Sequence, residues 1–383
     1  MSDENRLPPL MTPEEQMMES IRPYLLDPRE DYPEPYYMLE FNGIPFSTLG
    51  GIQALSGQKK NGKTFVLVQL MAAILGQESD RIDMYLPGLK VPERTIEHIG
   101  HLPKVLYVDT EMEKLNSAKV LRRVHWLCGW DMKEPNERLN VLWLRTVKRD
   151  EESQEEAYQK RFRLIKYAIE TLTPDIVFID GIRDIIGDFN DNQSSAALVN
   201  DLMEIAQSRN ICIWNALHLN PRPGNDDESK MRGHLGTELG NKVSDTLVSI
   251  KAKSQTGVTF TVKQNDARGK DLEDWQFEIV DDAGALGIPK IVSNGMNIPI
   301  RDKDAHDDPD DILAWINEAL SQYEWPMSQR DIKKNVFGGI GKQKNKDKQD
   351  ADLKVAKNLG YLVESTLKKN GYYMLQPPED LPF

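Results

Sequence analysis

The chain has 383 residues, enough for one large domain and one smaller one. Its composition, with 39% hydrophobic residues, 28% charged residues and a net charge of −13, is that of an ordinary soluble acidic protein. This charge excludes a surface that coats nucleic acid uniformly, so any contact with DNA has to be local.

The cysteines and the apolar stretches indicate a cellular location. Cys128 and Cys212 are the only cysteines and have no CxxC or CxxH spacing, so neither a disulfide framework nor a cysteine zinc site is expected. The longest apolar stretch, residues 65–76, is shorter than the roughly 20 residues of a membrane span, and the amino terminus has no signal-peptide pattern. We therefore expect a cytoplasmic protein without membrane contact.

The order of local patterns predicts the fold. Residues 1–40 are acidic and rich in proline, which suggests an amino-terminal arm with a short capped helix within 12–26. From 41 to 300, strand-like runs alternate with helical ones, which predicts an α/β domain with a mostly parallel sheet flanked by helices. The expected strands are 51–57, 104–111, 139–146, 175–180 and 211–218, the expected helices are 62–76, 113–129, 151–172 and 194–209, and antiparallel strands are expected near 245–252, 259–265 and 274–282.

A second domain is expected at the carboxyl terminus. Residues 301–311 are charged and nearly free of apolar side chains, as in a linker. Residues 312–383 have 11 Lys and Arg against 9 Asp and Glu, a net charge of about +2 in an otherwise acidic chain. Three helical patterns followed by a hairpin around residues 369–371 resemble a winged-helix domain, which binds either DNA or a protein.

The most specific motif is GQKKNGKT at residues 57–64, which matches the phosphate-binding pattern GxxxxGK[ST] between a strand and a helix. The glycines allow backbone N–H groups to face the phosphates, Lys63 supplies a cation for the β and γ oxygens, and the Thr64 hydroxyl is a magnesium ligand. The alternative is a glycine turn with a solvated lysine. The predicted ATP-binding residues are Gly57, Gln58, Lys59, Lys60, Asn61, Gly62, Lys63, Thr64 and Phe65.

Two acidic positions complete the predicted ATP and Mg²⁺ site. Asp180 ends an apolar strand and is expected to hold the magnesium through water, unless it merely caps the strand. Gly181 follows it and cannot accept a proton, so the general base has to come from another strand. If the strand at 104–109 lies beside the strand at 51–57, which leads into the phosphate-binding motif, Glu111 lies at the carboxyl edge of the sheet. Ligands of open α/β sheets bind at this edge, so Glu111 could polarise water there. Asp109 is the alternative base, and the further alternative is that both residues only cap the following helix.

Four motifs together resemble the RecA-like ATPases, and within these the plasmid RepA and DnaB-type hexameric helicases. They are GQKKNGKT, DTEM at 109–112, FIDG at 178–181 and NALHLN at 215–220, and the resemblance covers about residues 40–280. It implies that Glu111 is the general base and that His218, or Asn220 beside it, senses the γ-phosphate. The plain reading of His218 is a hydrogen-bonded surface histidine.

The resemblance also implies a homo-oligomer, a hexamer in which a neighbouring subunit completes each site. The family places these cations in a K-x-R pattern, of which only Lys263 is present, since Asn265 replaces the arginine. Arg268 is a substitute, and an ordinary exposed hairpin is the alternative.

DNA contacts are expected in two places. The resemblance implies that the polar loop at 220–242 touches single-stranded DNA through Lys230, Arg232 and Lys242, although NDDES within it also fits a surface loop. In the winged-helix-like domain, the third helix would bring Lys354 and Lys357 to a duplex groove, with Lys346, Lys348, Lys368 and Lys369 on phosphates.

The resulting expectation is an ATP-hydrolysing, DNA-associated motor, a replicative helicase or DNA remodeller of a plasmid or mobile element. The alternatives are an ATP-switched DNA-binding regulator without helicase activity and, third, a small-molecule kinase. The kinase is disfavoured because the sequence shows neither a lid nor an acceptor pocket.

Overall fold

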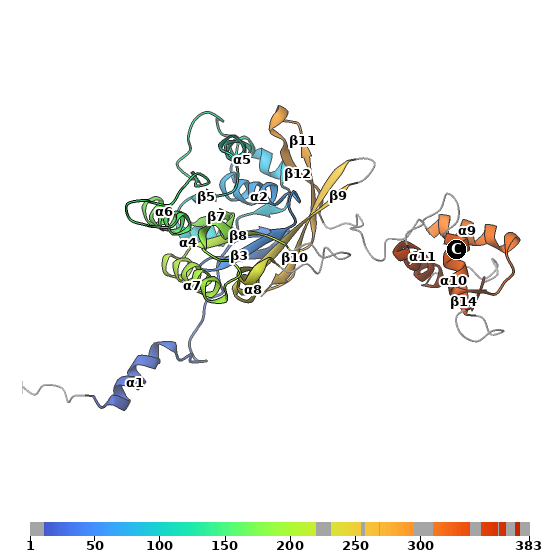
Figure 1. The fold of residues 1–383 in the computed structure, drawn as a ribbon, viewed down its shortest axis with the longest axis horizontal. Coiled ribbons are helices and arrows are strands. Elements are labelled where there is room, and N and C mark those ends of the chain that lie inside the picture. The colour runs from blue at the N-terminus through green and yellow to red at the C-terminus, as the bar shows by residue number, and fades with distance from the viewer. Residues whose placement is uncertain are drawn as a thin grey trace, which may run out of the picture. The chain divides into compact units, whose positions relative to one another are not determined.

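The computed structural model describes most of the chain (Figure 1). The described residues are 11–219, 231–253, 257–267, 269–294, 309–337, 346–358, 360–364 and 372–375. They divide into two units, residues 1–36 and residues 37–383. Within the described part, no helix is both long enough and apolar enough to cross a membrane.

In the first unit, α1 (Pro13–Ile21) is followed by a 3-10 turn, η1 (Arg22–Tyr24). Thr12 and Glu15 form the capping box that the sequence predicts, because each side chain bonds to the backbone N–H of the other residue. No side chain of α1 is buried, and Met17, Met18 and Ile21 are exposed.

The second unit is built on a nine-stranded sheet, counted over the described residues, with the order β12-β11-β10-β9-β3-β8-β7-β5-β6. The strands from β9 to β6 are parallel, and β10, β11 and β12 continue the sheet in antiparallel fashion. The predicted α/β class, a mostly parallel sheet flanked by helices, is confirmed. The strands are β3 (Ile52–Gly57), β5 (Val105–Asp109), β6 (Leu139–Trp143), β7 (Ile176–Asp180), β8 (Cys212–His218), β9 (Asp245–Lys253), β10 (Val258–Ala267), β11 (Trp275–Val280) and β12 (Ile288–Asn294).

Helices cover both faces of this sheet. On one face, α6 (Ala157–Leu172), α7 (Asn192–Arg209) and α8 (Gly233–Lys242) share a core with the strands, in which Val108, Ile179 and Ile213 are buried. On the other, α2 (Lys63–Leu75) packs on α5 (Lys114–Leu127) and on a small sheet of order β2-β1-β4. The remaining elements are β1 (Tyr37–Phe41), β2 (Ile44–Thr48), α3 (Asp80–Tyr85), β4 (Leu89–Lys90), α4 (Glu93–Ile99), η2 (Ile182–Ile185) and η3 (Gly284–Leu286).

The strand order corrects one condition of the sequence argument. β5 does not lie beside the cradle strand β3, because β8 and β7 stand between them. Asp109 of β5 is instead in register with Asp180 of β7, and Gly57 of β3 with His218 of β8. The carboxyl ends of these parallel strands therefore meet at one edge, where ligands of open α/β sheets bind.

A second correction concerns the loop predicted at 220–242. Residues 233–242 form α8, because Leu235 and Leu239 lie one turn apart and are both fully buried. The three glycines of this helix have low helix propensity, so tertiary packing overrides the local preference. Gly236 is needed for packing, since a Cβ there would lie 2.4 Å from the carbonyl carbon of Met231.

The carboxyl-terminal elements have a core of their own, which includes Ile316, Phe337 and Leu353. A helix, a short strand, two helical segments and two strands follow one another, and the strands form an antiparallel sheet of order β13-β15-β14. The elements are α9 (Pro309–Gln322), β13 (Met327–Ser328), α10 (Gln329–Asp331), η4 (Ile332–Phe337), α11 (Lys346–Asn358), β14 (Leu362–Glu364) and β15 (Tyr372–Leu375).

Candidate functional site

The predicted phosphate-binding loop at residues 57–64 (the cradle) connects the end of β3 to the start of α2. Gly62 has a left-handed backbone (φ +85°), and a Cβ there would lie 2.6 Å from the ring of Phe260. A Cβ on Gly57 would lie 2.8 Å from the carbonyl oxygen of Ser249. Both glycines are therefore required by the close approach of β9 and β10 to the loop, in addition to any requirement from phosphates.

Lys63 is the first residue of α2 and is only 8% exposed. Its ammonium group donates to the carbonyl oxygens of Gly57 (3.0 Å) and Gln58 (3.3 Å) and to Nδ1 of His218 (2.9 Å). Burial lowers the pKa of Lys63, and the carboxylates of Asp180 and Glu111 oppose that shift. An anion bound in the cradle would therefore compensate a partly desolvated cation.

Thr64 and Asp180 meet beside Lys63. The Thr64 hydroxyl donates to Oδ2 of Asp180 at 3.2 Å, and the Tyr107 hydroxyl donates to the same oxygen at 3.0 Å. Burial, together with the nearby carboxylates of Glu111 and Asp109, raises the pKa of Asp180 to about 6. A buried carboxylate in this environment is stabilised by a divalent cation.

These two residues fit a magnesium ion. One hydroxyl and one carboxylate are a donor set that Mg²⁺ uses when water and substrate phosphates supply its other ligands. The described residues contain no cluster of three or more His, Cys, Asp or Glu side chains arranged for a metal. Thr64 and Asp180, whose side-chain oxygens lie 3.2 Å apart, are the residues that would hold the ion.

Glu111 reaches this site from β5 by crossing the end of β7. The turn after β5 is held by the Thr110 hydroxyl, which donates to the carbonyl oxygen of Gly181 at 2.9 Å. Gly181 has a left-handed backbone (φ +103°), and a Cβ on it would lie 2.7 Å from Cγ of Glu111. The residue after Asp180 therefore has to be glycine, because the Thr110 hydroxyl, which is nearer still, and the side chain of Glu111 together fill that space.

Glu111 and His218 lie together at the edge of the cradle. Nε2 of His218 is 3.5 Å from Oε2 of Glu111, and the Glu111 side chain is 38% exposed, so water can reach it. A hydrogen bond from His218 is the largest influence on Glu111 and lowers the pKa of its carboxyl. At neutral pH Glu111 is thus ionised and able to accept a proton.

Asp109 has a different environment from Glu111. Its Oδ1 accepts from the backbone N–H groups of Glu111 (3.0 Å) and Met112 (2.9 Å), and its side chain is fully buried. Asp109 thus holds the turn that positions Glu111, and it does not cap the following helix, whose N-cap residue is Glu113. Burial raises the pKa of Asp109.

Lys263, the cation expected to complete the site of a neighbouring subunit, lies on β10 and forms an ion pair with Asp274 at 3.9 Å. Of the loop residues, Arg232 caps the start of α8, and its N–H donates to the carbonyl oxygen of His218 at 3.0 Å, whereas Lys242 ends the same helix. Lys354 and Lys357 are exposed on α11. The described parts of the structure do not include Asn220, Lys230, Arg268, Lys368, Lys369 and the side chains of Lys346 and Lys348.

Sequence reasoning missed the role of Tyr107. Its fully buried hydroxyl bonds to Asp180 and its pKa is raised well above the ordinary value, mainly by burial. Tyr107 lies two residues before Asp109 and so on the same side of β5. The sequence did offer a signal for this role, because Tyr107 stands in an otherwise apolar strand that ends in aspartate.

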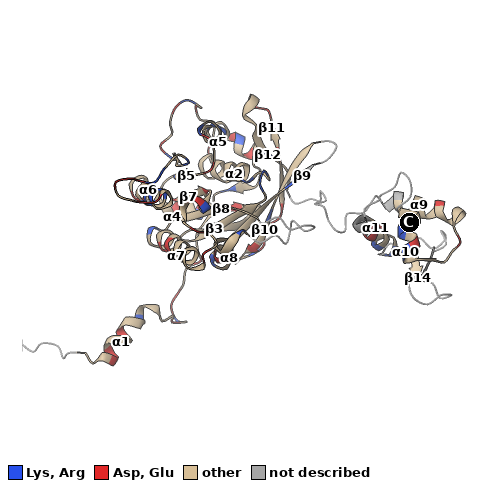
Figure 2. Ribbon diagram, viewed as in Figure 1, with Lys and Arg blue, Asp and Glu red and all other residues tan. Residues whose placement is uncertain are grey.

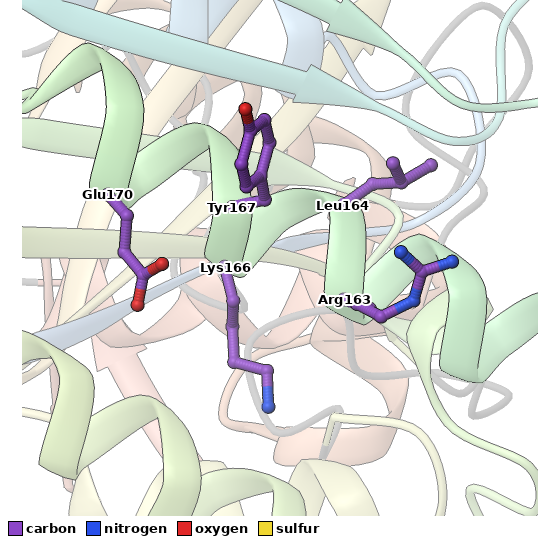
Figure 3. Close-up of a pocket in the computed structure, with 5 residues that line it drawn as sticks. All are labelled: Arg163, Leu164, Lys166, Tyr167 and Glu170. Carbon is purple, nitrogen blue, oxygen red and sulfur yellow. The ribbon is translucent and has the colours of Figure 1, made fainter.

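Next to the site, the guanidinium groups of Arg183 and Arg232 lie 4.1 Å and 5.6 Å from the ring centre of Phe189. The sequence did not single out Arg183. A separate surface hollow on α6 is lined by Arg163, Leu164, Lys166, Tyr167 and Glu170, none of which is a predicted site residue (Figure 3).

Comparison with known proteins gives a family match over part of the chain. Residues 45–221, which include the cradle, Glu111, Asp180 and His218, match the family model of an AAA domain. No curated protein matches the chain significantly. A solved KaiC-like protein from the archaeon Pyrococcus horikoshii OT3 aligns with 68% of this chain and 99% of its own at 15% identity and a TM-score of 0.42, and nothing about function is drawn from that likeness. The domain match and the arrangement of Lys63, Thr64, Asp180 and Glu111 point to a P-loop ATPase.

Proposed function

We propose that the protein is a magnesium-dependent ATP hydrolase whose turnover drives a RecA-like motor on DNA, as in a replicative helicase or DNA remodeller of a plasmid or mobile element. The observation that supports hydrolysis most is the convergence of two strands on one cradle. Asp180 from β7 meets Thr64, while Glu111 from β5 reaches His218 and lies beside Lys63. Metal binding and proton abstraction are thereby divided between two carboxylates.

The residues divide the work as follows. Lys63 places its charge on the β and γ oxygens, while the N–H groups of the loop bind the phosphates. Thr64 and Asp180 would hold the magnesium, which would neutralise part of the phosphate charge. Glu111 orients the attacking water and takes up its proton, and His218 contacts the γ-phosphate or the water from β8.

A ring assembly is part of this proposal. In the family that the sequence resembles, cations from the neighbouring subunit complete each site, and Lys263 and Arg268 are the candidates here. The ion pair of Lys263 with Asp274 is consistent with this role only if a neighbouring nucleotide replaces Asp274 as its partner. Hydrolysis would then depend on assembly into a homo-oligomer, which we expect to be a hexamer.

The carboxyl-terminal elements are the candidate for duplex binding. The proposal of a winged helix is supported by their order, in which α9 and β13 precede α10, η4, α11 and two further strands, and α11 would be the recognition helix. The sequence of α11 contains both lysines and aspartates, so that its charge is mixed (Figure 2). Single-stranded DNA is assigned to the neighbourhood of Arg232, whose guanidinium lies near Phe189.

The test is strand displacement on a forked DNA with ATP and magnesium, with Lys63→Ala as the inactive control. Unwinding that Lys63→Ala abolishes supports the motor. ATP-dependent DNA binding without unwinding would instead support an ATP-switched regulator, and ATP turnover by Lys63→Ala equal to that of the wild type would refute the ATPase site itself.

A further inference from the structure

His218 connects the cation of the cradle to the predicted general base. Its Nδ1 lies 2.9 Å from the Lys63 ammonium group, and its Nε2 lies 3.5 Å from Oε2 of Glu111. The ring is 32% exposed, and its backbone is held in register with Gly57 at the start of the cradle. The three side chains thus form one chain, Lys63–His218–Glu111.

The contacts of Lys63 assign the tautomer of His218. An ammonium group has three donors and no acceptor, so Nδ1 of the ring has to accept. The imidazole proton is then on Nε2, which faces the Glu111 carboxylate. A neutral His218 in this tautomer satisfies both neighbours, and the opposite tautomer would set two donors against each other.

All three donors of Lys63 are engaged by the protein, two by the carbonyl oxygens of Gly57 and Gln58 and one by His218. A phosphate can be bound by this ammonium group only if one of these acceptors gives way. The carbonyl oxygens belong to the cradle backbone, whereas His218 offers a side chain that can rotate. His218 is therefore the partner that a phosphate displaces.

We propose that His218 is a positioning residue that clasps Lys63 and Glu111 together in the nucleotide-free site and is displaced from Lys63 by the β-phosphate. This regulation rests on the proposed ATPase function. When Lys63 turns to the phosphate, His218 loses its acceptor role and its hold on Glu111 is no longer fixed by Lys63. The general base is thereby restrained until the nucleotide is bound.

The affinity for ADP distinguishes this role of His218 from that of a sensor of the γ-phosphate. ADP has the β-phosphate that Lys63 meets but lacks the γ-phosphate. If His218 is only a sensor, its removal leaves the affinity for ADP unchanged. If His218 is the clasp, its removal strengthens ADP binding, because Lys63 then has no hydrogen bond to His218 to lose when it binds the phosphate.

The experiment measures ADP binding to the full-length protein by calorimetry. We expect His218→Ala to bind ADP about tenfold more tightly than the wild type, the value of one hydrogen bond to a charged group. His218→Asn keeps an acceptor at the position of Nδ1 without reaching Glu111, and we expect its ADP affinity to stay near that of the wild type. An unchanged or weaker affinity of His218→Ala would overturn the clasp.

Nitrogen NMR of histidine-labelled wild-type protein tests the tautomer without a variant at the site, and the loss of one signal in His218→Asn assigns it. We expect an Nε2–H imidazole without nucleotide and a changed Nδ1 signal with ADP. An Nδ1–H tautomer, or an unchanged signal, would overturn the proposal. Lys63→Ala serves to separate the two claims: normal ADP binding by that variant rejects the cradle, whatever the state of His218.

Discussion

Gly181 and Glu111 share one space at the end of β7, because a Cβ on residue 181 would lie 2.7 Å from Cγ of Glu111. The Thr110 hydroxyl lies nearer still, so the turn after β5 that carries Thr110 and Glu111 leaves no room for a side chain directly after Asp180. Because residue 181 has no side chain, Glu111 can reach the cradle.

Gly181→Ala tests this relationship. The new methyl group should push Glu111 from its position, and a displacement of about 1 Å costs on the order of a hundredfold in turnover. ADP binding should remain, because Gly181 is outside the cradle. The measurements are steady-state ATP hydrolysis and ADP affinity.

Gly100→Ala is the matched control for that variant. Gly100 also has a left-handed backbone (φ +71°), but nothing lies within 4 Å of a Cβ on it. Both substitutions introduce backbone strain of about 1 kcal/mol. Equal turnover in the two variants would show that Glu111 does not depend on the space at residue 181.

The raised pKa of Asp180 predicts a pH-dependent stability. Its carboxyl has a pKa of about 6 in the folded protein against an ordinary 3.8, so the folded state binds the proton more tightly than the unfolded state. Without nucleotide and metal, the ionised carboxylate therefore destabilises the fold above pH 6, by about 3 kcal/mol, and this penalty disappears below about pH 4.

Asp180→Asn should remove that penalty while it eliminates magnesium-dependent hydrolysis. The stability of the variant relative to the wild type should thus be higher at pH 8 than at pH 4, as measured by chemical unfolding in a chelator. The exposed Asp188 provides the control substitution Asp188→Asn. A relative stability of Asp180→Asn that is the same at both pH values would contradict the buried, proton-binding carboxyl.

Charge reversal on α11 tests the duplex contact. Lys354→Glu with Lys357→Glu should weaken duplex DNA binding, because each substitution places a negative charge in the groove that the lysine is expected to enter. ATP hydrolysis without DNA should be unaffected. The exposed Lys148 gives the control Lys148→Glu. If duplex affinity measured by anisotropy is the same in both proteins, α11 is not the DNA-binding element.

Much of this site was predictable because its signals are local. The glycines and Lys63 of the cradle form a contiguous motif, and the strand ending at Asp180 is an apolar run. Alternation of helical and strand patterns also predicted the parallel sheet. These features follow from period and spacing within about ten residues.

The features that sequence reasoning missed depend on neighbours distant in the chain. The separation of β5 from β3 by two intervening strands follows from the crossover connections, which no local pattern records. α8 was hidden by its glycines, and its helical form depends on the burial of Leu235 and Leu239. The contact between Lys63 and His218 joins residues 155 positions apart.

The direct test of the account is the substitution Glu111→Gln, which retains shape and removes the proton acceptor. We expect it to bind ATP with magnesium as the wild type does, and to hydrolyse it in a single turnover on the order of a hundred- to ten-thousandfold more slowly. Glu113→Gln, at an exposed carboxylate two residues away, should hydrolyse normally. Wild-type single-turnover hydrolysis by Glu111→Gln would contradict the claim that β5 supplies the general base.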